Sequence, residues 1–371
     1  MQKKIIALAV AGLVSGAAFA QSNVTVYGIA DMSYVNYSDA NATGYSPTGQ
    51  IQSGQWKTSR FGLKGSEDLG NGLSAIFQTE FGMLMDVNNS TIKQRPSLVG
   101  LRSANLGEIK AGNMTTFEDE LLVATSTMLE YGTIASPKYV YIETAGGEAR
   151  NMISNAAFYY SPVWSGFQIK AGYSSHASNS DDVASATTAT GATGNNRVLA
   201  TAVHYSNGAF IVGATYEYNR SQDYTGVSSP DSGNTWNLAA SYNFGFIRVG
   251  GAYGTINYAQ NPGVSRDDRK QWHIGASVPI TPNDLISLNY AHATVGYNDS
   301  KPTWNDDSIG FWGIGYQHSL SKRTTLYAAY GDVNQSSSNQ TRASLDSTTP
   351  VSGTTANAFE QAFAAGIRHN F

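Results

Sequence analysis

The sequence predicts an all-β membrane protein, a transmembrane antiparallel up-and-down β-barrel of about sixteen strands. Three observations support this prediction. Many segments alternate between apolar and polar residues, the connections alternate between short and long, and 13% of the residues are charged, against about 25% in typical soluble proteins. No apolar run of about 18 residues follows the N-terminal segment, so we expect no transmembrane helix.

The alternation has a period of two residues, which is typical of a β-strand with one apolar face. It is clearest in four segments, 166–173, 209–218, 235–244 and 271–280. In the second of these, Phe210, Val212 and Tyr216 share one face. Thr215 and Glu217 lie on the other face, so each such segment is expected to separate an apolar from a polar environment.

The connections fall into two classes that alternate along the chain. Short turns are expected at 69–72, 105–107, 161–166, 206–208, 244–245, 281–284 and 320–323. Long polar connections are expected near 38–54, 84–92, 116–149, 174–196, 219–233, 258–269, 296–306 and 335–357. In an up-and-down meander every second connection lies at the same end, so one end is trimmed and the other elaborated, as in outer-membrane barrels.

A soluble β-sandwich would also alternate, but two features favour a barrel in lipid. The polar faces contain few Lys and Glu, and a sheet in lipid must close because its edge groups have no water to bond. Aromatic residues also collect near strand ends, as two interfacial belts require. They are Tyr159, Tyr160, Trp164, Phe244, Phe246, Phe311, Trp312 and Phe371. An outward apolar face leaves a polar interior, and sixteen strands enclose an aqueous channel.

The N-terminal residues 1–20 have the three parts of a cleaved signal peptide. Lys3 and Lys4 form the basic start, 5–14 is a short apolar run, and Ala18-Phe19-Ala20 fits the cleavage rule. We therefore expect 21–371 to form a single barrel domain whose formal charge is −4 − 2 = −6. This acidity argues against a nucleic-acid partner, and the absence of Cys excludes disulfides.

Several longer blocks resemble one known family. They read "VTVYGIADMSY", "SRFGLKGSEDLGNGLSAIFQTEF", "VGLRSANLGEIKAGN", "YYSPVWSGF", "LSKRTTLYAAYG" and "GIRHNF". Together they are similar to the general diffusion porins of Gram-negative bacteria, in the branch typical of betaproteobacteria. The resemblance implies a 16-stranded homotrimeric barrel in the outer membrane, surrounded by its lipid and lipopolysaccharide and inserted by the barrel-assembly machinery. It also implies an inward-folded third loop that narrows a pore for small hydrophilic solutes.

The third loop corresponds to 116–149, the longest insertion between strands, and a loop of this length is usually functional. Its apolar residues predict that it packs, and its acidic residues predict that it faces a basic wall. The acidic side of the predicted constriction comprises Glu80, Glu118, Asp119, Glu120 and Glu130. The basic side comprises Arg60, Lys64, Arg95 and Arg150, with Lys170 and Arg248 as further inward-pointing cations. Opposed charges across an aqueous gap would orient polar solutes and set ion preference.

One position departs from the family pattern. The strand that enters the third loop often reads "GRQ-TP" in the family, whereas here Asn113 stands in place of the Arg and Phe117 in place of the Pro. The substitution at Asn113 predicts one lumen charge fewer and leaves the ion preference open.

The C-terminal residues "FAAGIRHNF" alternate and are expected to form the sixteenth strand, which closes the barrel against the first. The residues expected to face lipid include Phe363, Ile367, His369 and Phe371. The resemblance adds that a terminal Phe on this strand is the usual recognition mark for outer-membrane insertion.

Several other functions compete with the general pore. An enzyme is disfavoured because no HExxH, GxSxG or phosphate-binding loop occurs, so we expect no catalytic residue, metal or cofactor. A substrate-specific outer-membrane channel, selective for a sugar or an anion, is the closer alternative. A receptor or adhesin working through the long loops, or Ca²⁺ binding by loop carboxylates, also stays open.

Overall fold

The computed structural model describes the following residues of the 371-residue chain, and the remainder is not discussed: 23–38, 49–88, 93–127, 134–137, 140–141, 152–175, 177, 197–220, 233–258, 269–295, 307–335 and 361–371. The expected signal peptide, together with Glu130 and Arg150, lies outside these residues.

Nearly all described residues belong to strands. The first nine are β1 (Asn23–Ser38), β2 (Gln50–Ser53), β3 (Arg60–Gly70), β4 (Leu73–Gly82), β5 (Lys93–Ser103), β6 (Gly107–Thr115), β7 (Met152–Tyr160), β8 (Phe167–Ser174) and β9 (Arg197–Ser206). The others are β10 (Phe210–Arg220), β11 (Gly233–Asn243), β12 (Arg248–Tyr258), β13 (Arg269–Pro279), β14 (Asp284–Val295), β15 (Asp307–Ser319), β16 (Thr324–Gln335) and β17 (Gln361–Asn370). The seven expected short turns all connect neighbouring strands.

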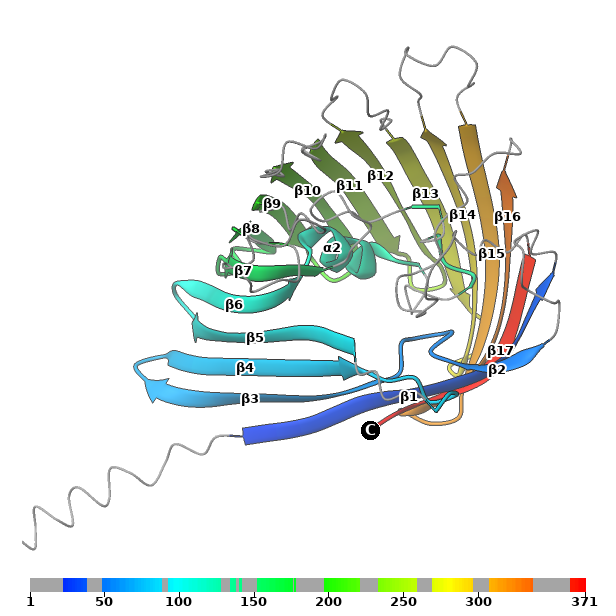
Figure 1. Cartoon of the computed structure of the whole chain (residues 1–371), viewed down its shortest axis with the longest axis horizontal. Helices are drawn as coiled ribbons and strands as arrows, with labels where there is room; N and C mark the ends of the chain where they lie inside the picture. Colours follow the sequence, from blue (N-terminus) through cyan, green and yellow to red (C-terminus); the bar gives the residue numbers. More distant parts are fainter. Residues whose placement is uncertain are drawn as a thin grey trace, which may run out of the picture.

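The strands form one closed antiparallel sheet (Figure 1). Each strand from β3 to β17 pairs with the next, and β1 pairs with β17 on one side and with both β2 and β3 on the other. Because β2 and β3 share one position beside β1, the 17 strands described make 17 − 1 = 16 positions around the barrel. The predicted fold class is confirmed.

The seam is closed by the last residue. Backbone N–H and C=O groups of Gly28 and Phe371 exchange two hydrogen bonds of 3.0 Å, and Asn370 N–H donates to the carbonyl of Arg323 in a short turn. A Cβ on Gly28 would overlap the Phe371 ring, so only glycine lets this ring lie across β1. Four residues of β17 and the terminus point outward as expected: Phe363, Ile367, His369 and Phe371. The three apolar ones among them, Phe363, Ile367 and Phe371, are 42–48% exposed.

The outer face carries aromatic belts over the later strands. Near the short turns of β8 to β12, a chain of ring contacts with centroids 4.5–6.3 Å apart joins Phe167, Tyr205, Phe210, Tyr242, Phe244 and Phe246. Farther along the strands, outward pairs lie 5.2–5.5 Å apart: Trp236–Tyr253, Trp272–Tyr290 and Trp312–Tyr330. Two of the expected belt residues, Tyr160 and Phe311, instead point inward and are buried, because each lies on the opposite parity of its strand.

The segment after β6 lies inside the ring of strands, where Figure 1 shows its helix α2 (Phe117–Thr125). This helix lies against β9, β10, β11 and β12. Farther along the segment, 134–135 and 140–141 are buried against inner side chains of the wall. Among the residues that the structure describes, no helix is long and apolar enough to cross a membrane.

Candidate functional site

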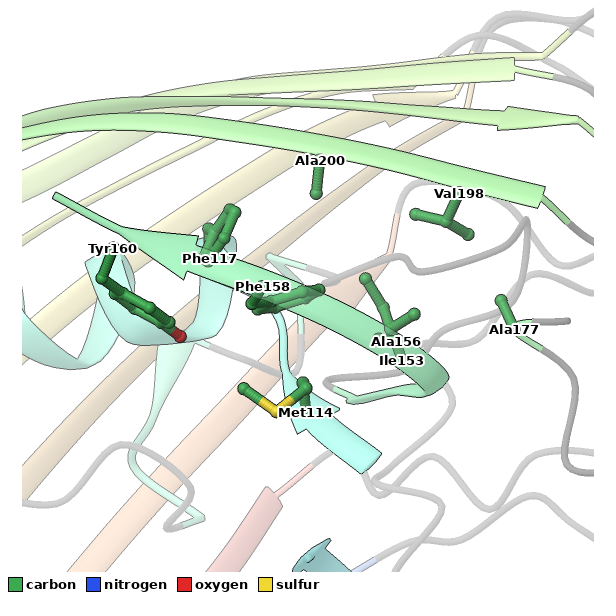
Figure 2. Packing of buried hydrophobic residues seen from close by; sticks show 9 residues of the cluster. All are labelled: Met114, Phe117, Ile153, Ala156, Phe158, Tyr160, Ala177, Val198 and Ala200. Atoms are coloured by element: carbon green, nitrogen blue, oxygen red, sulfur yellow. The ribbon is translucent and has the colours of Figure 1, made fainter. Parts of the chain in front are cut away.

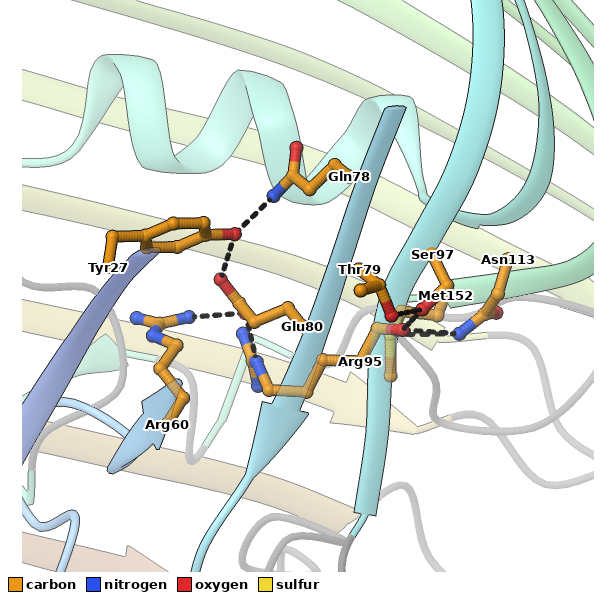
Figure 3. Close-up of polar contacts among 9 residues, drawn as sticks. All are labelled: Tyr27, Arg60, Gln78, Thr79, Glu80, Arg95, Ser97, Asn113 and Met152. Atoms are coloured by element: carbon orange, nitrogen blue, oxygen red, sulfur yellow. Dashed lines mark hydrogen bonds and ion pairs between the residues drawn. The ribbon is translucent and has the colours of Figure 1, made fainter. Parts of the chain in front are cut away.

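Two arginines meet one carboxylate on the inner face of β3, β4 and β5 (Figure 3). Glu80 Oε1 accepts hydrogen bonds from Arg60 Nη1 at 3.1 Å and from Arg95 Nε at 2.5 Å. The exposed fractions of the three side chains are 9% for Glu80, 11% for Arg60 and 17% for Arg95. The structure thus brings together three residues that the sequence assigned to the constriction, Arg60 and Glu80 from strand parity and Arg95 from its place at a strand edge.

A β-bulge directs these side chains toward each other. Thr79 pairs with Ser97 and Phe81 pairs with Gln94, so Glu80 on β4 lies opposite two residues of β5, Arg95 and Pro96. Proline cannot donate a ladder hydrogen bond and is therefore tolerated at such an irregularity. The "QRPS" sequence at this point is the local signal for the bulge.

A second layer of polar groups supports Glu80. Its Oε2 accepts a hydrogen bond of 3.2 Å from the Tyr27 hydroxyl, which in turn accepts one of 2.8 Å from Gln78 Nε2. Lys64 Nζ lies 5.0 Å from the centre of the Tyr27 ring, within the range of a cation–π contact. We call Arg60, Lys64, Arg95 and Glu80 the β3–β5 cluster; its formal charge is 3 − 1 = +2, in a chain whose net charge is −4.

Helix α2 begins with a regular cap and an acidic first turn. Thr116 Oγ1 accepts a 3.1 Å hydrogen bond from the Asp119 N–H, and carboxylates in this turn are favourable beside the positive end of the helix dipole. Glu118 is buried and Asp119 is half-buried.

The third acid of this turn, Glu120, pairs with the nearby wall and not with the β3–β5 cluster. Its Oε2 lies 2.7 Å from Lys170 Nζ on β8, and its Oε1 accepts a 2.7 Å hydrogen bond from the Tyr160 hydroxyl on β7. Glu120 thus faces a basic group of the wall, as expected of the loop acids, and this group is Lys170. Its carboxylate holds the helix to the barrel.

Apolar packing holds the start of the same helix (Figure 2). The Phe117 ring lies 4.5 Å from the Phe158 ring and 5.6 Å from the Tyr160 ring, measured between centroids. The buried cluster around them comprises Met114, Phe117, Ile153, Ala156, Phe158, Tyr160, Ala177, Val198 and Ala200. The family departure at Phe117 therefore supplies an anchor for the helix.

The C-terminal end of α2 is held by β11 and β12. Arg248 Nη2 donates to the carbonyl of Ala124 at 2.6 Å and to Ser241 Oγ at 3.0 Å. A cation at this end complements the helix dipole. Lys170 and Arg248, the two additional inward cations named from the sequence, thus hold opposite ends of one helix. Strand parity alone did not distinguish this role from lining the pore.

Glycines on the inner wall make room for the third loop. At six inner positions an added Cβ would lie too close to an atom of the loop: Gly213, Gly250, Gly254, Gly275, Gly313 and Gly331. For example, a Cβ at Gly250 would lie 2.6 Å from the carbonyl oxygen of Thr125. Sequence reasoning missed this signal, which is a set of inward-facing glycines on β10, β12, β13, β15 and β16.

The predicted loss of a lumen charge at Asn113 is wrong. Asn113 pairs with Ser97, two residues from Val99, whose 62% exposure marks the outer face. The Asn113 amide donates to the Arg95 carbonyl at 3.1 Å and accepts from Ser154 Oγ at 3.3 Å. An outward-pointing position removes no charge from the interior.

The described residues contain no group of three or more His, Cys, Asp and Glu side chains able to hold a metal ion. The geometry offers instead an inner wall with a net positive cluster and a docked loop. Such an arrangement acts on passing solutes through its field and its width.

Comparison with known proteins gives a consistent result. A family model described as Gram-negative porin matches residues 7–338. Outer membrane porin protein 32 of Delftia acidovorans is 33% identical over 338 residues, covering 88% of each chain. An outer membrane porin protein of Bordetella pertussis is 28% identical over 374 residues, covering 89% of this chain and 94% of the relative.

Two solved structures are similar in fold. An anion-selective porin from Comamonas acidovorans superposes with a TM-score of 0.75 at 24% identity, covering 95% of this chain and all of that one (100%). The trimer form of OmpT from Vibrio cholerae superposes with a TM-score of 0.67 at 15% identity, covering 94% of this chain and 99% of that one.

Proposed function

The chain belongs to the Gram-negative porin family and forms a channel in the outer membrane, and we propose that it admits small hydrophilic solutes by passive diffusion with a preference for anions. Porins are channels rather than enzymes, and the proposal accordingly assigns no catalytic step to any residue. A pore of this kind needs no cofactor, because the solute is selected by size and charge alone.

The β3–β5 cluster is the observation that supports the anion preference. Glu80 is already hydrogen-bonded to Arg60 and Arg95, so its negative charge is largely directed at these two groups. Lys64 adds a third cation, and it is exposed. Within a Debye length of about 8 Å at physiological salt, an ion beside this wall meets an excess of positive charge. The similar solved structure named an anion-selective porin agrees with this proposal.

Planar-bilayer recording across a salt gradient tests the proposal. In a potassium chloride gradient, we expect ohmic steps and a reversal potential of the sign set by chloride. A reversal potential of the opposite sign would overturn the anion preference, and the absence of ohmic conductance would overturn the pore. Saturable block of the current by one sugar or one organic anion would instead favour the substrate-specific channel.

We further propose that the constriction includes the cluster together with loop residues of 116–149, among them Glu118 and Asp119. Glu130 and Arg150 are assigned to it on the sequence alone, as an acid of the loop and a cation at the loop end. Residues 1–20 are proposed as the signal peptide, which predicts a mature N-terminus at Gln21 by mass spectrometry. Phe371 is proposed as the recognition mark for the assembly machinery, and lipopolysaccharide is proposed as part of the lipid around the barrel.

We also propose a homotrimer, with the outer face of β4 to β7 inside the subunit contact. Among the apolar outer residues of these strands lies a polar row: Thr79 Oγ1 is 3.0 Å from Ser97 Oγ, beside the outward-pointing Asn113 and Ser154. Polar groups are costly against lipid and acceptable against protein. Channel insertion in steps of three and recovery of a trimer after cross-linking would support this proposal. Insertion in single steps and recovery of monomer alone after cross-linking would contradict it.

A further inference from the structure

The barrel wall is interrupted beside the seam, between β2 and β3. Ser53 pairs with Met32 and Arg60 pairs with Ile29, so only two residues of β1 separate these pairs. The six residues 54–59 occupy the place of two and cannot lie flat in the sheet. We call 54–59 the inner knuckle, because the side chain of its Trp56 lies among inward-facing side chains of the wall.

One carboxylate fixes the backbone of this knuckle. Asp31 is fully buried (0% exposed), and its two oxygens accept from the N–H groups of Trp56 at 3.4 Å and of Lys57 at 3.1 Å. Its backbone is bracketed by Ser59, whose hydroxyl accepts from the Asp31 N–H and donates to the Asp31 carbonyl, both at 3.0 Å. Gly54 N–H donates to the same carbonyl at 2.9 Å. This set of bonds defines the knuckle as a built element and not as a loose end of a loop.

The knuckle buries an indole ring inside the barrel. Trp56 is 2% exposed, and its ring centroid lies 4.7 Å from that of Tyr327 on β16. The Tyr327 hydroxyl donates to Asp31 at 2.8 Å, so backbone anchor and ring contact form one unit. Truncating so fully buried a ring would leave a cavity that its neighbours fill only in part.

The same buried cluster contains the far part of the third loop. Ile134 and Ala135 belong to it together with Trp56 and Tyr327. On the wall side, an added Cβ at Gly313 would lie 2.5 Å from the Ala135 carbonyl oxygen, so the loop lies directly on β15. The loop is thus held by the glycines of the wall and by the knuckle, which is contributed by the opposite side of the seam.

We propose that the inner knuckle is a second constriction element, in which Trp56 acts as a positioning residue for the far part of the third loop and thereby limits the size of solutes. This inference deepens the proposed function, because it takes diffusion through the pore as given. It differs from the anion preference in what it controls: the knuckle sets width, and the β3–β5 cluster sets the sign of the preferred ion.

The variant Trp56→Ala tests the role of the ring, with Trp56→Phe as the conservative partner. Swelling of liposomes that contain the channel is measured in neutral sugars of increasing size. We expect Trp56→Ala to admit sugars too large for the wild-type pore and to show noisier single-channel currents, and we expect Trp56→Phe to restore most of the size limit. A size limit and current noise unchanged in a folded Trp56→Ala channel would overturn the proposal.

The matched control is Trp272→Ala, which removes a 39%-exposed indole from the outer belt. It should leave the size limit as in the wild type; an equal widening would overturn the proposal by showing a general effect of losing a Trp. If Trp56→Ala fails to fold, Tyr327→Phe removes only the hydroxyl that reaches Asp31. This variant should widen the pore in the same direction, and an unchanged pore would count against the knuckle.

The reversal potential separates this inference from the proposed function. Because Trp56 is neutral and buried, its variants should change the size limit and leave the sign of the reversal potential as in the wild type. A wild-type pore without anion preference would refute the charge proposal and leave the sugar result standing. A wild type that forms no pore would refute both.

Discussion

The inner wall of the barrel has two regions of opposite character. Along β3 to β5 the inward positions carry long charged or polar side chains, namely those of Arg60, Lys64, Gln78, Glu80 and Arg95. Along β10 to β16, beneath the third loop, many inward positions are glycines, and buried neutral groups such as Asn237 and Asn289 bond to the loop. Inward and outward residues alternate in the same way in both regions. The regions differ in that the inward residues of β10 to β16 face the docked third loop.

This difference shows what an inward position reports. A polar side chain on that parity is compatible with water or with a docked segment, whereas a glycine there indicates close approach of another backbone. The wall that touches the loop therefore has little side-chain volume at these glycines, and a charged group there such as Arg248 bonds to the loop. The wall of β3 to β5 retains the groups that act on solutes. Each prediction below removes one side of this contrast, from the largest expected effect to the smallest.

Filling the covered wall should have the largest effect. In Gly313→Ala, the new Cβ would lie 2.5 Å from the Ala135 carbonyl oxygen and 2.7 Å from Ala135 Cα, so the loop must move away from β15. Overpacking of this kind costs about 1–3 kcal/mol. We expect a lower temperature for the loss of the folded form in gel-shift assays and a smaller conductance, because the loop is displaced into the pore.

Gly310→Ala on the same strand is the control. There the new Cβ would meet no heavy atom closer than 3.6 Å, which is an ordinary contact. If both variants behave alike, the glycines of β15 are not a seat for the loop.

Releasing the start of the helix should have a smaller effect. Lys170→Met removes the ammonium that pairs with Glu120, whose side chain is 30% exposed and therefore partly screened. We expect a loss of about 1 kcal/mol from the docking of α2, near the upper limit for partly exposed pairs. Hydrogen exchange of the amides of 117–125 should become faster, with the barrel strands unchanged.

The exposed Lys270 provides the matched control. Lys270→Met should leave the exchange of helix amides as in the wild type. Unchanged exchange in Lys170→Met would mean that the Phe117 packing, and not the ion pair, holds this end of the helix.

Much of this fold could be predicted from the sequence, because period-two alternation and turn length are local properties. The seven short turns follow from turn length. The C-terminal closing strand and the inward direction of Arg60 and Glu80 follow from the alternation of inward and outward residues. The partner of Glu120 could not be predicted in this way. Parity tells which way Lys170 points and does not tell how far along the barrel the loop returns to it.

The inner knuckle was missed for a related reason. Its six residues, "GQWKTS", contain no alternation, and the chain on either side continues as strand. The signal lies in a pairing register between Met32 and Ser53 that only the closed sheet defines. Asn113 shows the converse case, in which a family motif suggested a lumen position and the register places the residue outside.

Neutralising the open wall should shift selectivity without disturbing the loop. In Arg60→Gln with Arg95→Gln, the β3–β5 cluster falls from +2 to 0. A unit charge at ~10 Å in water changes the energy of a neighbouring anion by about 0.4 kcal/mol, or about twofold in its local concentration. The double variant should therefore lose about fourfold in the anion concentration beside the cluster and should have a lower anion-over-cation permeability. The reversal potential measures this ratio, and Lys322→Gln with Arg323→Gln in a short turn is the control that removes the same charge outside the cluster.

Glu80→Gln should give the smallest shift, and in the opposite direction. Removing the one carboxylate raises the cluster from +2 to +3, which predicts about a twofold gain in anion preference at low salt. The gain should shrink as salt rises, because the Debye length falls from about 30 Å at 0.01 M to about 3 Å at 1 M. Arg60 and Arg95 would also lose their shared acceptor, so a gain smaller than expected, with noisier currents, would indicate that Glu80 mainly orders the two arginines. A shift toward cations would mean that this order, and not the charge itself, sustains the preference of the open wall.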